Sequence, residues 1–229
     1  MKITRQSTVD SLASTNTHMK ENLDAFQNGD ALRAITQTKG RGRRGNPWHT
    51  TGGRNLTFSF MIRSDKNISN RLFIGVALAL CEIFDQFGIN ASIKLPNDIY
   101  VEDEKIAGML IETVTKGNQI YHICGVGINI NEKNPKKYDE KATSLYKLTQ
   151  KYVILEPLFD TFVSVYNQQV DQKNVFANFK EKLLERRQYT KYLENLYFLT
   201  DITPSFTCTI ENHKDSLNIP CFKLKFFYL

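Results

Sequence analysis

The stretch around which this chain is organised is Gln37-Thr-Lys-Gly-Arg-Gly-Arg-Arg-Gly-Asn-Pro-Trp48. It packs three arginines and three glycines into the six residues from Gly40 to Gly45, and the only Trp of the chain follows. Between Ala31 and Ser64 there are seven Lys or Arg residues and no Asp or Glu. Glycines let backbone N–H groups approach a ligand, and arginines offer charged planar donors that match phosphate and carboxylate. The stretch therefore predicts a mobile loop that closes over an anionic small molecule.

The same stretch matches parts of three other patterns. Gly40, Gly42 and Gly45 have the spacing of the dinucleotide-binding fingerprint, but Asn46-Pro47 and Gly52-Gly53 follow where that motif requires a helix. A Walker phosphate loop is excluded because no Gly-Lys-Ser/Thr follows the spacing. The third pattern is a basic nucleic-acid patch, although so short a run more often binds something smaller or is merely solvated.

Outward from this stretch, hydrophobic periodicity predicts alternating strands and helices. We expect a short strand and loop at 3–13, and strands at 31–37, 56–62, 91–95, 98–102, 106–115 and 119–130. We expect helices after Ser14-Thr15-Asn16, from Ser69 or Asn70 to Gly88, from Pro157 onward and at 174–185, with 131–155 irregular. The short connections imply antiparallel neighbours, so the predicted fold class is α+β, with a mixed, largely antiparallel sheet flanked by helices.

Composition narrows the class of protein. The 229 residues are 41% hydrophobic and 11% aromatic, which is enough to fill a sizeable core. Much of the net charge of +6 lies in the basic stretch, so it is local. The four cysteines stand far apart with no C-x-x-C pair, which predicts buried free thiols rather than a zinc site or disulfides. With neither an apolar signal core at the start nor a run of membrane-spanning length, we expect a soluble cytoplasmic protein.

Four motifs occur in a fixed order, and together they resemble one family. They are Gly40-Arg-Gly-Arg-Arg-Gly-x-x-Trp48, Lys94-Leu-Pro-Asn-Asp98, Lys105-Ile-Ala-Gly108 and Gly127-Ile-Asn-Ile130. The set is similar to the biotin protein ligases over about residues 5–185. The resemblance implies a class II synthetase-like catalytic domain at 1–185 and a small β region at 186–229. Relatives usually end in a glycine-turned β-barrel, whereas this chain has no glycine after Gly127, so its 186–229 region departs from the pattern.

The resemblance also implies a reaction. Biotin protein ligases use ATP and Mg²⁺ to convert biotin into biotinoyl-5'-AMP, and then pass biotin to a lysine of a biotin carboxyl carrier domain. Both steps place negative charge on oxygens in transit, so we expect the protein to act through positioning and charge stabilisation. The chain begins at the catalytic region with no room for an N-terminal DNA-binding module, so we expect no DNA binding.

The family motifs assign roles to particular residues, and each residue also has a purely structural explanation. Ser14, Thr15 and Asn16 would line the biotin head group, because hydroxyl and amide groups can satisfy a ureido ring, but they are equally good helix-capping residues. Lys105 would touch the reacting carboxyl group, although it follows a charge run of the kind that is usually solvated. The implied biotin-binding set is completed by Gln37, Arg41, Gly42, Arg43 and Gly108.

The remaining assignments concern the nucleotide. Lys94, Asn97 and Asp98 flank a turn, which is their structural explanation; the resemblance makes Lys94 catalytic together with Lys105 and Arg43, and makes Asp98 a magnesium ligand. Asn129 follows a glycine that could serve packing alone. The implied nucleotide-binding set is Arg41, Arg44, Trp48, Asn97 and Asn129.

Two other functions stay open from the sequence. A lipoate–protein ligase uses related adenylate chemistry, but lipoate has no ureido ring and its ligases carry a different glycine-rich loop. A degenerate biotin-binding or nucleic-acid-binding module is the non-enzymatic alternative; the intact lysines and basic loop argue against it, and the unusual C-terminal region keeps it open.

Overall fold

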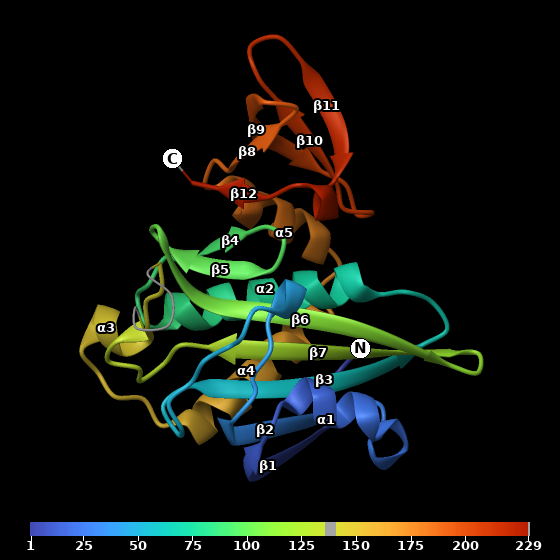
Figure 1. The fold of residues 1–229 in the computed structure, drawn as a ribbon, viewed down its shortest axis with the longest axis vertical. Coiled ribbons are helices and arrows are strands. Elements are labelled where there is room, and N and C mark those ends of the chain that lie inside the picture. Colours follow the sequence, from blue (N-terminus) through green and yellow to red (C-terminus); the bar gives the residue numbers. More distant parts are fainter. Residues whose placement is uncertain (136–140, 229) are drawn as a thin grey trace.

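The computed structural model describes residues 1–135 and 141–228 and contains two sheets. The larger sheet has seven strands in the order β1-β2-β3-β7-β6-β5-β4 (Figure 1). The first pair is parallel and all other neighbours are antiparallel. Its strands are β1 (Arg5–Leu12), β2 (Asp30–Gln37), β3 (Leu56–Ser64), β4 (Ser92–Lys94), β5 (Asp98–Val101), β6 (Glu104–Lys116) and β7 (Gln119–Ile128).

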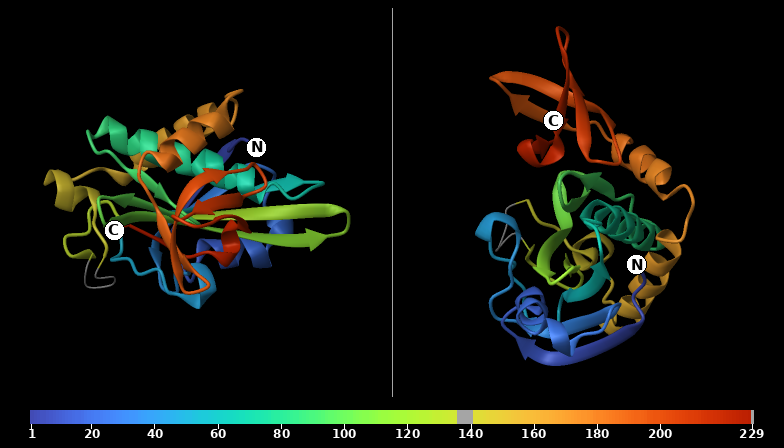
Figure 2. Two further views of the ribbon diagram at one scale, coloured as in Figure 1. Left: turned by 90° about the horizontal axis from the view of Figure 1, so that it is seen from above. Right: turned by 90° about the vertical axis from the view of Figure 1, so that its right-hand side faces the viewer.

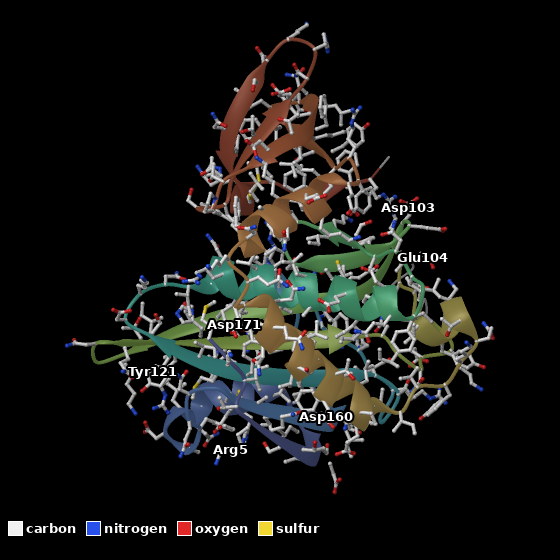
Figure 3. All side chains as sticks on the ribbon, turned by 180° about the vertical axis from the view of Figure 1, so that it is seen from behind. Arg5, Asp103, Glu104, Tyr121, Asp160 and Asp171 are labelled. Carbon is white, nitrogen blue, oxygen red and sulfur yellow. A yellow bond between two sulfur atoms is a disulfide. The ribbon has the colours of Figure 1, made fainter. Side chains whose placement is uncertain are left out.

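Helices cover both faces of this sheet, as the α+β prediction requires. Viewed from behind, α2 (Ser69–Gln86) and α4 (Leu155–Gln169) lie across the sheet (Figure 3). The helix α1 (Thr15–Glu21) packs on the opposite face, against β2, β3 and β7. The remaining helices are α3 (Leu145–Thr149), α5 (Val175–Leu184), and the 3₁₀ turns η1 (Leu23–Ala25), η2 (Arg43–Gly45) and η4 (Cys221–Lys223).

Alternation along β3 explains this layering. Phe58 packs against Phe159 and Phe162 of α4. Met61 points to the other face and joins a separate buried cluster with Met19 of α1. Because successive strand residues face opposite sides, β3 contributes side chains to two separate hydrophobic clusters. The predicted alternation in this strand is confirmed.

The stretch 131–155 was predicted to be irregular, and this is wrong for part of it. Residues 136–140 lie outside the described residues, but Leu145–Thr149 forms α3. Ser144 is its N-cap, since its hydroxyl accepts a hydrogen bond from the Lys147 N–H at 3.1 Å. The Ala-Thr-Ser-Leu signal for this cap is local, but a five-residue helix is too short to show periodicity.

The smaller sheet follows α5 and lies beyond it, at one end of the molecule (Figure 2). It is antiparallel, in the order β11-β10-β9-β8-β12. Its strands are β8 (Tyr189–Tyr192), β9 (Asn195–Ile202), β10 (Thr207–Glu211), β11 (Ser216–Pro220) and β12 (Phe226–Phe227). The turns replace glycine with Leu193, Glu194 and Phe206, all at positive φ. The division of the chain at 185/186 stays a prediction.

The cysteines divide into two kinds. Cys81 and Cys124 are buried free thiols, as predicted. Cys208 and Cys221 are joined by a disulfide, so the prediction of free thiols is wrong for this pair. The β10–β11 hairpin brings together two residues that are 13 positions apart, a proximity that no local cysteine motif reveals. Among the described residues, no helix is both long and apolar enough to cross a membrane.

Candidate active site

A cavity of about 240 Å³ lies between the sheet and the β2–β3 connection. Figure 1 shows this connection rising in front of β3, β7 and β6. The cavity is lined by all but two of the residues singled out from the sequence. Those that line it are Ser14, Thr15, Asn16, Gln37, Arg41, Gly42, Arg43, Trp48, Asn97, Asp98, Lys105, Gly108 and Asn129.

One end of the cavity is a network of uncharged hydrogen-bonding groups. Thr15 N–H donates to Gln37 Oε1 at 2.7 Å, and Thr15 Oγ1 lies 2.6 Å from Ser59 Oγ. Ser59 in turn donates to Asn16 Oδ1 at 2.6 Å. Ser14 caps α1, accepting a hydrogen bond from the Thr17 N–H at 3.4 Å. The capping and ligand-lining explanations of this segment are therefore compatible, because Ser14 caps the helix while Thr15 and Asn16 turn inward.

Glycines in β7 form the floor of the cavity. A Cβ on Gly125 would lie 2.3 Å from Asn16 Oδ1, and one on Gly127 would lie 2.4 Å from the Trp48 indole. Both distances are shorter than real contacts allow, so only glycine lets the amide and the indole lie flat on the strand. Because the two glycines are two residues apart, both bare positions face the same side of the sheet.

The basic loop is internally ordered. Trp48 N–H donates to Gly40 O at 2.9 Å and Gly42 N–H donates to Asn46 O at 2.7 Å, which makes a narrow ribbon. Arg41 donates to Thr17 Oγ1 and Glu112 Oε1, both at 3.2 Å. The loop carries no acid of its own, but an acid from β6 supplies a partner for Arg41. Ligand-dependent ordering of the loop stays a prediction.

A cationic region lies at the other end of the cavity. Arg43 Nη1 donates to Asn97 Oδ1 at 3.1 Å, and Lys105 Nζ lies 2.7 Å from Asp98 Oδ1. Burial and the neighbouring charge of Arg44 lower the pKa of Arg43. The Lys105 side chain is only 20% exposed, so it is not the solvated lysine that its charge run suggests.

The acids of that charge run have partners elsewhere. Glu104 pairs with Lys147 at 3.0 Å, and Asp103 pairs with Arg186 at 2.5 Å. Both acids lie at the β5–β6 turn (Figure 3). Lys105 is the member of the run whose side chain lines the cavity. A Cβ on Gly108 would lie 3.0–3.2 Å from the ends of Lys105 and Asp98, so this glycine keeps the pair close to the strand.

Trp48 covers the floor between these two ends. Its ring centroid lies 5.4 Å from Lys105 Nζ, a cation–π distance. Its indole Nε1 is buried and has no hydrogen-bond partner among the described residues. An unpaired buried donor is costly, so this group is available for a ligand acceptor.

Two residues predicted from the sequence are not brought to the cavity. Lys94 Nζ lies 4.0 Å from the centroid of the Tyr100 ring and 5.7 Å from that of Tyr228, and burial lowers the pKa of Lys94. Arg44 is exposed and has φ 56° in the 3₁₀ turn of the loop. The cavity geometry therefore gives no support to a catalytic role for Lys94 or a nucleotide contact for Arg44.

Sequence reasoning missed three polar residues of the site. Asn55 lines the cavity and fixes the end of β7 by accepting a hydrogen bond from Ile130 N–H at 3.0 Å. Ser59 and Glu112 lie behind the cavity wall and contact Asn16. For Ser59 and Glu112 the signal was a polar residue within a strand, which is weak by itself because one face of a strand is often solvated. Asn55 lies just before β3 and carries no such signal.

Within residues 1–135 and 141–228, no three His, Cys, Asp or Glu side chains gather as a metal site. Asp98 and Glu132 are the acids among the cavity-lining residues. Asp98 is already next to Lys105, and Glu132 Oε1 lies 3.6 Å from Arg54 Nη1. The protein side chains alone do not build a closed cation site here.

Comparison with known proteins shows the family to which this chain is related. A sequence model of the Biotin/lipoate A/B protein ligase family matches residues 8–129. The bifunctional ligase/repressor BirA of Escherichia coli is 36% identical over 123 residues, which are 51% of this chain and 38% of BirA. The biotin–protein ligase of Homo sapiens is 33% identical over 111 residues, covering 44% of this chain and 15% of the human protein. The chain thus spans well under half the length of these curated relatives.

Solved structures show the same fold over nearly the whole chain. The biotin protein ligase of Aquifex aeolicus, solved in complex with biotin and ATP, aligns with a TM-score of 0.82 at 23% identity, covering 98% of this chain and 99% of that one. This likeness concerns the fold, including the small C-terminal sheet. The family match spans more than half of the chain and includes the basic loop, Lys105 and Asn129. The chain therefore belongs to the Biotin/lipoate A/B protein ligase family.

Proposed function

We propose that this protein activates biotin with ATP as biotinoyl-5'-AMP and transfers biotin to a lysine of a biotin carboxyl carrier domain. The observation that carries the proposal is the polarity of the cavity. Uncharged hydroxyl and amide groups of Thr15, Asn16 and Gln37 line one end, and the cations Arg43 and Lys105 line the other. Biotin has matching ends, because its ureido ring is neutral and both donates and accepts hydrogen bonds, while its carboxylate is anionic.

The first chemical step is attack of a biotin carboxylate oxygen on the α-phosphorus of ATP, with pyrophosphate leaving. Lys105 Nζ and the Arg43 guanidinium are the cations available to hold the carboxylate and phosphate oxygens as the new P–O bond forms. Fixed donors aimed at developing charge stabilise a transition state without reorganising during the reaction. The Asp98 carboxylate keeps the Lys105 ammonium in place.

In the second step the acceptor amine attacks the acyl carbon of the mixed anhydride. The C–N bond forms, the bond from acyl carbon to phosphate oxygen breaks, AMP leaves, and the amine proton is lost to solvent. The mixed anhydride hydrolyses readily, so the Trp48 indole and the loop that carries it protect it by excluding water. Asn97 and Asn129 line the cavity close to the cations and are proposed contacts of the nucleotide.

The residues of this site fit a Mg²⁺ ion that would bind together with ATP. Mg²⁺ commonly keeps several waters and is held by one or two carboxylates together with substrate phosphates. Asp98 lies at the cationic end of the cavity and can supply one oxygen, and the phosphates of ATP would supply others. A Mg²⁺ ion held there by Asp98 and the phosphates would neutralise phosphate charge.

The acceptor test separates the proposal from its main competitor. Purified protein is incubated with ATP, Mg²⁺ and a biotin carboxyl carrier domain, with either biotin or lipoate, and the intact mass of the carrier is measured. We expect one biotinoyl addition, none on a carrier whose acceptor lysine is replaced by Arg, and little or no lipoyl addition. Equal transfer of lipoate would assign the chain to lipoate attachment, and binding of biotin without transfer would leave a binding module.

A further inference from the structure

The carboxylate of Glu112 joins two parts of the site that are far apart in the sequence. Glu112 lies in β6, and its side chain is 18% exposed. One oxygen, Oε2, accepts from Asn16 Nδ2 at 3.1 Å. The other, Oε1, accepts from Lys20 Nζ at 2.8 Å and from Arg41 Nη2 at 3.2 Å. A single acid therefore contacts the head-group end of the cavity, helix α1 and the basic loop.

The contact with Asn16 crosses a neighbouring strand. Asn16 reaches β6 by lying over Gly125 of β7, where any Cβ would come within 2.3 Å of Oδ1. Its Nδ2 group donates to both Leu110 O and Glu112 Oε2, each at 3.1 Å. Because both amide protons are used and Oδ1 already accepts from Ser59, Asn16 can offer a ligand only the second lone pair of Oδ1. The amide is thereby held as an acceptor for a ligand N–H.

The contact with Arg41 ties down the loop. The guanidinium donates to Thr17 on α1 and to Glu112 on β6, so it closes the near end of the loop against two elements. Burial alone raises the pKa of Glu112, but hydrogen bonds from Lys20 and Asn16 and the charge of Arg41 outweigh it and lower the pKa. Glu112 is therefore ionised at neutral pH, as its charge-assisted hydrogen bonds with Lys20 and Arg41 require.

We propose that Glu112 is a positioning residue that sets the N–H specificity of Asn16 and, through Arg41, couples the head-group end of the cavity to closure of the basic loop. The inference rests on the proposed function, since the N–H that it orients Asn16 to accept is that of a ureido ring. Glu112 does not line the cavity itself, so its effect passes through Asn16 and Arg41.

The test uses the full chain and follows biotin binding by the fluorescence of Trp48, the only Trp. Glu112→Ala removes the acceptor and the charge, Glu112→Gln keeps one acceptor oxygen without the charge, and Lys20→Met is the matched control. That control removes the other cation on the same carboxylate and leaves Asn16 and Arg41 in contact with it. Thermal unfolding checks that each variant folds.

We expect the Kd for biotin to rise on the order of tenfold to a hundredfold in Glu112→Ala, the scale of a lost charge-assisted hydrogen bond. Glu112→Gln should lie between, and Lys20→Met should raise the Kd far less than Glu112→Ala, because Asn16 and Arg41 keep their contacts with the carboxylate. The wild type should discriminate against biotin methylated on a ureido nitrogen, and this discrimination should shrink in Glu112→Ala. Protease cleavage of the loop should increase in both Glu112 variants.

A double-mutant cycle distinguishes the proposed role of Glu112 from a merely structural role. If Glu112 acts through Arg41, the effects of Glu112→Gln and Arg41→Met on loop cleavage should be far from additive. Additive effects, or unchanged discrimination against the methylated analogue, would overturn the proposal while the wild type still binds biotin. A wild type that binds no biotin would instead contradict the proposed function itself.

Discussion

The ammonium group of Lys105 lies 2.7 Å from Asp98 Oδ1 and 5.4 Å from the centroid of the Trp48 ring. If it stabilises charge on the reacting carboxyl group, Lys105→Ala should slow adenylate formation by a factor on the order of a hundred or more. The side chain is largely buried, so a modest loss of thermal stability is also expected. Single-turnover adenylation measures the rate, with Lys191→Ala, an exposed lysine of β8, as control. Normal adenylation in Lys105→Ala would reduce the residue to an ion-pair partner of Asp98.

His122 predicts how stability depends on pH. The ring is buried between Ser69 Oγ at 3.4 Å and Lys66 O at 3.3 Å, and burial lowers its pKa from the ordinary value near 6.5. The unfolded chain therefore binds this proton more tightly than the folded chain. The stability linked to this group is fully present above about 6.5 and is lost as pH falls through the lower, folded-state pKa.

We therefore expect the free energy of unfolding to fall as the pH is lowered below about 6.5, and this pH dependence to flatten in His122→Gln. Denaturant unfolding at several pH values measures it. The exposed His213 provides the matched control substitution His213→Gln. If the free energy of unfolding depends equally on pH in the wild type and in His122→Gln, other groups cause the loss of stability at acidic pH.

The orientation of the Lys94 side chain could not be predicted from the sequence motif. The motif places Lys94 beside Asp98, and the two are indeed cross-strand partners. The direction of the side chain, however, is decided by Tyr100 and Tyr228, and Tyr228 lies 134 positions further along the chain. Motif order predicted which residues line the cavity; a contact of that sequence separation lies outside any local pattern.

Strand β7, which forms the floor of the cavity, and the basic loop pack directly against each other. Gly127 is the surface on which Trp48 rests, so Gly127→Ala should displace the indole and shift its fluorescence. Overpacking of this kind destabilises by about 1–3 kcal/mol. The thermal loss should largely disappear in the Trp48→Ala background, where the clash has no partner. If Gly127→Ala is equally destabilising in both backgrounds, the indole does not lie on that glycine.

The β8–β9 hairpin offers a second element-scale prediction. Its two-residue turn places Leu193 at φ 47° and Glu194 at φ 64°, a conformation that costs roughly 1–2 kcal/mol for each ordinary residue. Asn-Gly is the sequence this turn favours. Replacing Leu193-Glu194 by Asn-Gly should therefore raise the unfolding temperature and leave biotin binding unchanged. A lower unfolding temperature would mean that the exposed Leu193 makes a contact that outweighs the strain.

Elements with strong periodicity were predictable and short or glycine-free ones were not. The alternation of Phe58, Phe60 and Ile62 identified β3 and its buried face. Helix α3 is too short to display a period, and the turn at Leu193-Glu194 lacks the residues that mark such turns. The small sheet was recognised as a β region, but its strand order depends on long-range pairing such as β12 with β8.

In the whole molecule, two interactions hold the C-terminal part of the described chain in place. The disulfide between Cys208 and Cys221 staples η4 to β10 in the small sheet. Tyr228 follows β12 and lies against β4 of the large sheet, where its hydroxyl donates to Ile93 O at 3.3 Å. The centroid of its ring lies 3.6 Å from Arg186 Cζ. The residue that follows β12 therefore contacts the large sheet, and the glycine-free region from 186 to 228 is a folded part of the molecule.

Exchange of labelled pyrophosphate into ATP tests whether this cavity joins biotin to AMP, as we propose. The assay needs no acceptor protein, so it isolates the first step from any defect in carrier recognition. We expect exchange that depends on both biotin and Mg²⁺, is abolished or nearly so in Lys105→Ala, and is far weaker with lipoate. Exchange that is absent with biotin, or equally fast with lipoate, would contradict the proposal.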